Sequence, residues 1–266
     1  MSYQLSDLVR LMRCLRDPDH GCPWDRSQSY QSIVPFTLEE AYEVGDVIER
    51  GAFDELRGEL GDLLFQVIFY SRLAEEEGRF TLDDVIEAIV SKLLKRHPHV
   101  FPDATFESFG TSSGASVSAI KQTWEAKKAE ERASRGQLDL FDDVPMALPA
   151  LSRAQKIQKR AVRVGFDWPS IDGVFEKIHE ELDELHEARS SGNLDAVREE
   201  YGDLLFTMVS LARHLGIDSE QALRLATQKF ESRIGEVVRL ARAQGIDLTI
   251  ATDNEKNGLW DLAKKG

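Results

Sequence analysis

Apolar residues recur every three or four positions along most of this chain, and this spacing predicts amphipathic helices. In the first such segment, residues 5–16, the apolar side chains are Leu5, Leu8, Val9, Leu11, Met12 and Leu15. A stretch rich in proline, glycine and aspartate, residues 17–25, predicts a turn after it. Further helices in the first half are expected over residues 38–50, 56–77, 81–96 and 119–134.

The second half repeats this helical pattern. A basic helix is expected over residues 151–164, followed by an acidic helix, a turn at Ser190–Asn193, a second acidic helix, and a helix that ends near Gln244. No segment alternates apolar and polar residues as a strand would. The predicted fold is therefore all-α, with two tandem domains built as helical hairpins or four-helix bundles. We place the domains at residues 1–135 and 150–266, joined by a linker over residues 136–149 that contains two prolines.

An acidic motif occurs once in each half at identical spacing. Adding 141 to the numbers of the first set gives the second, so that Glu40, Glu43, Glu59 and Asp62 become Glu181, Glu184, Glu200 and Asp203. Residues three apart share a helix face, and two such helices packed antiparallel would bring four carboxylates together. Such a cluster must take up protons or bind a cation, and carboxylate oxygens suit Mg²⁺. The repeat predicts a metal site, whereas one acidic pair alone would indicate only a solvated surface.

Alternative roles stay open for several of these residues. Glu40 follows Thr37 by three positions, and this spacing also fits a capping box that begins the 38–50 helix. Lys177 precedes Glu181 by four positions, which fits an intrahelical ion pair. Because Phe36 replaces Lys177 in the first repeat, we expect the second half to be the catalytic one and the first to be structural or weakly active.

Two basic residues and a tryptophan near the end of the chain are candidates for binding an anionic substrate. Lys229 and Arg233 lie four apart on one expected helix face, where they would grip phosphates or simply keep the surface soluble. Trp260 would stack on a nucleobase or anchor the end of the chain to the core. Phosphoryl transfer needs mainly such positioning and charge neutralisation by metal ions.

Composition and charge exclude several other classes of protein. The 266-residue chain carries a net charge of −14, which argues against binding to DNA or RNA. It has no apolar run long enough to span a bilayer and no signal-peptide pattern, and its two cysteines, Cys14 and Cys22, fit free thiols, so we expect a cytoplasmic protein. Nucleotide-binding glycine loops and the H-E-x-x-H motif are missing, and only Glu176-x-x-His179 fits a di-iron bundle.

With these residues identified, the chain resembles the MazG family of nucleoside triphosphate pyrophosphohydrolases in its tandem, two-domain bacterial form. The resemblance covers nearly the whole length. The matching segments are Gly21–Asp25, Arg96–Phe101, Arg153–Lys156, Arg160–Ala161 and both acidic sets. The chain departs from the family pattern at Ser29–Tyr30 and at Thr227, and the second departure concerns recognition of the base or ribose.

The resemblance implies Mg²⁺-dependent hydrolysis of nucleoside triphosphates, ATP among them, to a monophosphate and pyrophosphate. This activity would have broad base specificity and a housecleaning role in the nucleotide pool. It also implies a homodimer in which helices of both subunits form each site. The implied metal ligands are Glu181, Glu184, Glu200 and Asp203, with Glu40, Glu43, Glu59 and Asp62 as a weaker second set. The implied nucleotide-binding residues are Lys177, Glu180, Glu199, Lys229, Arg233 and Trp260, of which Lys177, Glu180 and Glu181 would be catalytic. The alternative is a module that senses Mg-nucleotide, or mediates an interaction, without hydrolysis.

Overall fold

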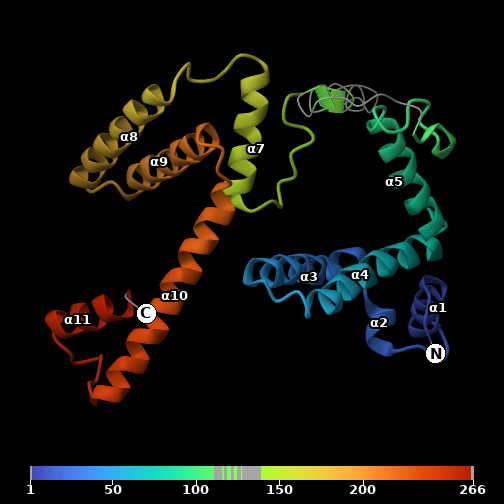
Figure 1. The fold of residues 1–266 in the computed structure, drawn as a ribbon, viewed down its shortest axis with the longest axis horizontal. Coiled ribbons are helices and arrows are strands. Elements are labelled where there is room, and N and C mark those ends of the chain that lie inside the picture. The colour runs from blue at the N-terminus through green and yellow to red at the C-terminus, as the bar shows by residue number, and fades with distance from the viewer. Residues whose placement is uncertain are drawn as a thin grey trace. The chain divides into compact units, whose positions relative to one another are not determined.

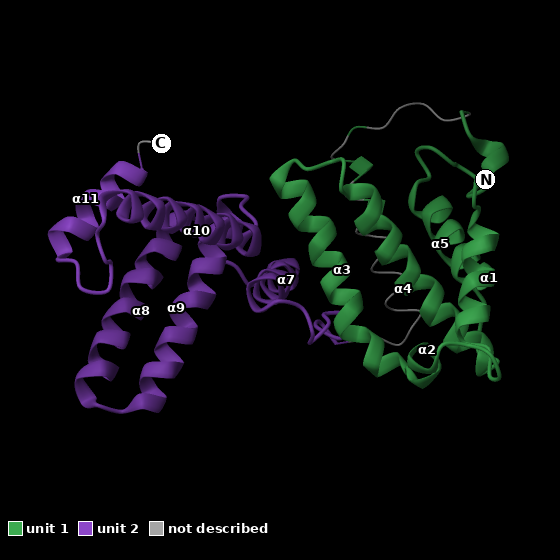
Figure 2. Ribbon diagram, turned by 90° about the horizontal axis from the view of Figure 1, so that it is seen from below, with its two compact units in different colours: residues 1–129 green, residues 130–266 purple. Residues whose placement is uncertain are grey.

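The computed structural model describes residues 2–110, 116, 119–120, 123–124, 127 and 139–264. The chain divides into two compact units, residues 1–129 and 130–266 (Figure 2). Helices, turns and loops make up all the described residues, without a strand, so the all-α prediction is confirmed. Most of the helix expected over residues 119–134 lies outside the described residues. Residues 139–149 of the expected linker form turns within unit 2. Residues 136–138 of that linker lie outside the described residues.

Unit 1 is built around a helical hairpin. Its elements are α1 (Leu5–Leu15), α2 (Pro23–Ser27), α3 (Tyr30–Arg50), α4 (Leu56–Glu76), α5 (Leu82–Arg96) and the short 3₁₀ helix η1 (Phe106–Ser108) (Figure 1). Helices α3 and α4 lie side by side, and α1 and α5 also contact α4. The buried core joins Met12 of α1, Ile33 of α3, and Ile68, Phe69 and Leu73 of α4.

The start of α3 differs from the prediction. The helix begins at Tyr30, where the Ser29 hydroxyl accepts a hydrogen bond from the backbone N–H of Ser32. Thr37 therefore lies inside the helix and caps nothing; its hydroxyl donates to the carbonyl of Ile33 instead. The expectation that Thr37 caps this helix was wrong because the helix starts seven residues earlier, at Tyr30, and continues through Pro35.

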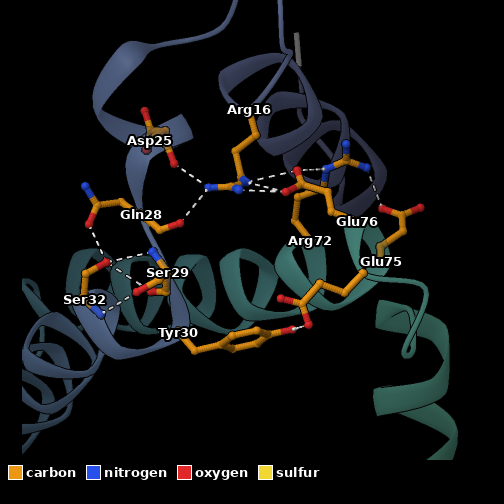
Figure 3. Close-up of polar contacts among 10 residues, drawn as sticks. Arg16, Asp25, Gln28, Ser29, Tyr30, Ser32, Arg72, Glu75 and Glu76 are labelled. Atoms are coloured by element: carbon orange, nitrogen blue, oxygen red, sulfur yellow. Dashed lines mark hydrogen bonds and ion pairs between the residues drawn. The ribbon is translucent and has the colours of Figure 1, made fainter.

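A buried arginine fixes the entry into this hairpin (Figure 3). The side chain of Arg16 is 8% exposed, and its Nη2 lies 2.7 Å from Oε2 of Glu76 at the end of α4. It also donates to the backbone carbonyl of Asp25 in α2. Burial opposes ionisation of Glu76, but Arg16 and Arg72 outweigh it and hold the pKa of Glu76 below its ordinary value. Arg16 thus ties α1, α2 and α4 together.

Unit 2 contains a second hairpin and a long helix. Its elements are α7 (Ala150–Arg163), α8 (Ile171–Ser191), α9 (Leu194–His214), α10 (Ser219–Gln244) and α11 (Asp253–Ala263). Gly192 ends α8 with a φ of 72°, which glycine adopts without strain, and the Asn193 side chain caps α9. The turn predicted at Ser190–Asn193 is thus the tip of the α8–α9 hairpin.

The end of the chain folds back as a helix that the periodicity did not predict. In α11, the Thr252 hydroxyl accepts from the backbone N–H of Glu255 and the Glu255 carboxylate accepts from the N–H of Thr252, which forms a complete capping box. This helix packs on the second half of α10 through the buried cluster Val237, Ala241, Leu259 and Ala263. In the part of the chain that the structure describes, no helix is long and apolar enough to cross a membrane.

Candidate active site

Three carboxylates converge on the α8–α9 hairpin of unit 2. Glu181, Glu184 and Glu200 each place one carboxylate oxygen within 4.8 Å of an oxygen of the other two. The first two come from α8 and the third from α9. The tight turn at Gly192 reverses the chain, so residues before it on α8 lie opposite residues after it on α9. Three negative groups at this separation strongly favour a cation or protons between them.

Glu181 is the buried member of this group. The residue is 4% exposed, and its Oε2 atom has no hydrogen-bond partner. A buried carboxylate oxygen without a partner is costly, because desolvation is not repaid by a bond. Since the whole donor set consists of carboxylate oxygens, it suits a hard divalent cation such as Mg²⁺.

Asp203, the fourth predicted ligand, is not part of this tight group. It lies on α9 three residues after Glu200 and is exposed. It still affects the group electrostatically: burial, followed by the negative charges of Glu184, Glu181 and Asp203, raises the pKa of Glu200. Glu180 and Glu199, the other predicted acids, are also exposed beside the group.

Lys177 inserts its ammonium between the acids of α8. Its Nζ lies 2.9 Å from Glu180 Oε1, 2.9 Å from Glu181 Oε1 and 3.9 Å from Glu184 Oε2. The intrahelical ion pair considered from the sequence is therefore present. Hydrogen bonds to Glu180 and Glu181 raise the pKa of Lys177, so this side chain carries a positive charge at any physiological pH.

Unit 1 holds a similar but not identical set. Glu40 of α3 and Glu59 and Asp62 of α4 offer oxygens within 4.8 Å of one another. Glu43 is not in that group, although it contributes, after burial and Asp62, to a raised pKa of Glu40. At the position of Lys177, the Phe36 ring packs edge-on against Trp24, with the centroids 5.7 Å apart.

The predicted nucleotide-binding residues of α10 and α11 form a separate cluster. The Arg233 guanidinium lies over the Trp260 ring, 5.8 Å from its centroid, and the Phe230 ring lies 5.8 Å from the same ring. Phe230 and Trp260, with Lys256 and Asn257, line an open groove of about 390 Å³. Lys229 is exposed on α10 beside it. Trp260 both packs against the α10–α11 core and lines this groove, so the two roles considered for it are compatible.

The structure does not bring this cluster to the carboxylates within one chain. Figure 1 shows α11 at the end of α10 that points away from α9. Lys256 and Asn257, which sequence reasoning missed, become candidates only because α11 folds back onto α10; their local signal was the capping box at Thr252 and Glu255.

Comparison with known proteins identifies the family. A family model described as the MazG nucleotide pyrophosphohydrolase domain matches residues 28–101 and again residues 170–238, together more than half of the chain. The chain belongs to the MazG family. The predictions of this family, of a tandem arrangement and of an enzyme are thereby confirmed. Both MazG matches include an α-hairpin with its acidic set, and the second continues through Lys229 and Arg233 but ends before Trp260.

MazG relatives match the chain along its length. A nucleoside triphosphate pyrophosphohydrolase of Escherichia coli is 49% identical over 264 residues, which cover 98% of this chain and 97% of that protein. A nucleoside triphosphate pyrophosphohydrolase/pyrophosphatase MazG of Thermotoga maritima is 41% identical over 260 residues, 98% of this chain and 95% of that protein. A nucleoside triphosphate pyrophosphohydrolase of Mycolicibacterium smegmatis is 39% identical over 166 residues, 61% of this chain and 47% of that protein.

Proposed function

We propose that unit 2 hydrolyses nucleoside triphosphates to a nucleoside monophosphate and pyrophosphate in the presence of Mg²⁺. The observation that carries this proposal is the convergence of Glu181, Glu184 and Glu200 around a buried oxygen without a partner. The names of the MazG relatives support the choice of substrate.

Glu181, Glu184 and Glu200 would hold the metal ion, and Asp203, three residues after Glu200 on α9, is the fourth ligand in our proposal. A Mg²⁺ ion bound there would neutralise the phosphate oxygens and orient the triphosphate. Glu180 and Glu199 are the exposed acids left beside the set. In our proposal Glu180 takes the proton of the attacking water and Glu199 contacts the nucleotide.

Binding of the nucleotide itself is assigned to the α10–α11 cluster. Arg233 and Lys229 supply two positive charges for phosphates, while the Trp260 and Phe230 rings offer faces on which a base can stack. Stacking accepts every base because each has a π-face. We therefore propose broad base specificity.

We also propose that the enzyme acts as a homodimer. Large apolar side chains are exposed on the α8–α9 hairpin: Phe175, Leu182, Tyr201, Leu205, Phe206 and Met208. An apolar surface of this kind usually marks an interface. Because the α10–α11 cluster lies away from the carboxylates of its own chain, a second copy would complete the site by placing its α10 against this hairpin.

Product analysis tests the proposed reaction. The protein is incubated with ribo-, deoxyribo- and oxidised triphosphates with and without Mg²⁺, and the products are separated by ion-exchange chromatography. The proposal expects equal amounts of monophosphate and pyrophosphate, only with the metal. Release of diphosphate and orthophosphate would contradict it. Tight nucleotide binding without any product over hours would favour the non-hydrolytic sensing module instead.

A further inference from the structure

In the acidic group of unit 2, an ammonium lies among the carboxylates that need positive charge. Nζ of Lys177 contacts Glu180 and Glu181 at 2.9 Å each and lies 3.9 Å from Glu184. Two of these three acids, Glu181 and Glu184, belong to the group that would hold the cation. A single positive charge neutralises only part of this group, because Glu200 lies on the other helix, α9, and Glu181 keeps one buried oxygen without a partner.

We infer that Lys177 is a tethered counter-ion that a divalent cation displaces from the carboxylates, and that the freed ammonium then binds the phosphates of the nucleotide. This inference rests on the proposed function and makes Lys177 a residue that couples the binding of metal and nucleotide. Its side chain is 30% exposed, so the ammonium can move toward solvent without breaking buried packing.

The charges explain why such an arrangement would favour the metal–nucleotide complex over the bare ion. If a divalent ion bound alone, the displaced ammonium of Lys177 would stay near it without a new partner. The repulsion between these two positive charges would weaken binding of the ion. When a triphosphate enters as well, the displaced ammonium gains an anionic partner. Nucleotide and metal then each strengthen the binding of the other, by the same factor.

Unit 1 provides an internal comparison. Its acidic group consists of Glu40, Glu59 and Asp62. Phe36 occupies the position of Lys177, and its uncharged ring packs on Trp24 and so supplies no positive charge to these carboxylates. The nearby Arg50 is occupied by Asp46 and Glu55. The tethered counter-ion is thus a feature that distinguishes the two repeats of this chain.

Binding of Mn²⁺ to the nucleotide-free full-length protein, followed by electron paramagnetic resonance, tests the inference. Bound Mn²⁺ ions that are present in the natural protein but absent from the Glu184→Gln variant are assigned to unit 2. Lys177→Met is expected to bind these ions about tenfold more tightly than the natural protein, since one positive charge near a divalent ion is removed. Lys159→Met removes an exposed lysine from α7 of the same unit and should leave the affinity unchanged. Lys177→Gln is measured alongside, in case the methionine variant folds poorly.

Nucleotide provides the second part of the test. An ATP analogue with a methylene group between the α and β phosphates should raise the Mn²⁺ affinity of the natural protein, and this gain should shrink in Lys177→Met. Equal Mn²⁺ affinity in natural, Lys177→Met and Lys177→Gln proteins would overturn the counter-ion role while leaving the proposed function intact. Absence of any Glu184-dependent Mn²⁺ binding, with or without nucleotide, would instead overturn the proposed metal site and this inference with it.

Discussion

Replacing Arg16 with methionine removes the buried guanidinium that joins three elements of unit 1 while keeping much of the side-chain volume. The change deletes the ion pair with Glu76, the bond to the Asp25 carbonyl and a contact with the Phe69 ring at 5.4 Å. Removing one partner of a buried ion pair costs about 3–5 kcal/mol. Glu76 is 28% exposed and keeps Arg72 as a partner, so the lower end, about 3 kcal/mol, is expected.

For a unit of this size, a loss of about 3 kcal/mol corresponds to a fall in melting temperature of about 10 °C. Differential scanning calorimetry measures this fall, with Arg13→Met as the matched control. Arg13 also pairs with a glutamate of α4, Glu75, but its side chain is 56% exposed, so its loss should cost less than about 1 kcal/mol. If Arg16→Met proved no more destabilising than Arg13→Met, the reasoning from burial would be refuted.

The effect of Arg16 should also depend on pH in a defined direction. The pKa of Glu76 is lowered from its ordinary 4.5, so its ionised form stabilises the folded protein at neutral pH. This contribution is fully present above the unfolded-state pKa and is lost as the pH falls through the lower folded-state pKa. The stability difference between the natural protein and Arg16→Met should therefore narrow below about pH 4.5.

Three further predictions concern backbone packing, metal binding and the nucleotide groove. Gly21→Ala would place its Cβ 2.5 Å from the carbonyl oxygens of Leu15 and Asp17, so thermal melts should show a loss of at least about 2 kcal/mol. Mg²⁺ should raise the melting temperature more at pH 8 than at pH 5. Burial, followed by the charge of Glu184, raises the pKa of Glu200 above its ordinary 4.5. Without Mg²⁺, the protein therefore loses stability as the pH rises from 4.5 through that raised pKa. Mg²⁺ bound to the ionised carboxylates restores this stability. Equal shifts at both pH values would contradict this. Trp260→Ala should raise KM for every triphosphate about tenfold or more by removing a stacking surface, as steady-state kinetics would show.

The helical hairpins could be predicted because their signals are local and repeated. The 141-residue offset makes Glu40 equivalent to Glu181, and Glu59 equivalent to Glu200. The structure brings Glu40 and Glu59 together in unit 1, and Glu181 and Glu200 together in unit 2. The tip of the second hairpin follows from Gly192 and Asn193 in the same way. In each case a short-range property, the helical period or a turn residue, determines the local structure.

What the spacing alone could not give depends on tertiary contacts. Helix α3 accommodates Pro35 because Ser29 caps an earlier start and Ile33 is buried in the core. Glu43 and Asp203 each share a helix face with another acid. The spacing does not determine how the two helices of a hairpin are turned toward each other, and in the structure both residues lie outside the groups of three close carboxylates. The distance between the carboxylates and Trp260 depends on the direction of α10, which is set by its packing against α7 and α9.

The most direct test of the catalytic site compares one isosteric change at equivalent positions of the two repeats. Pyrophosphate release is measured for Glu181→Gln in unit 2 and Glu40→Gln in unit 1, with folding checked by circular dichroism. Loss of a metal ligand is worth several kcal/mol of transition-state stabilisation, so Glu181→Gln should lower kcat on the order of a hundredfold or more. Glu40→Gln should retain most of the activity. A fully active Glu181→Gln protein, or a folded but inactive Glu40→Gln protein, would contradict the assignment of catalysis to unit 2.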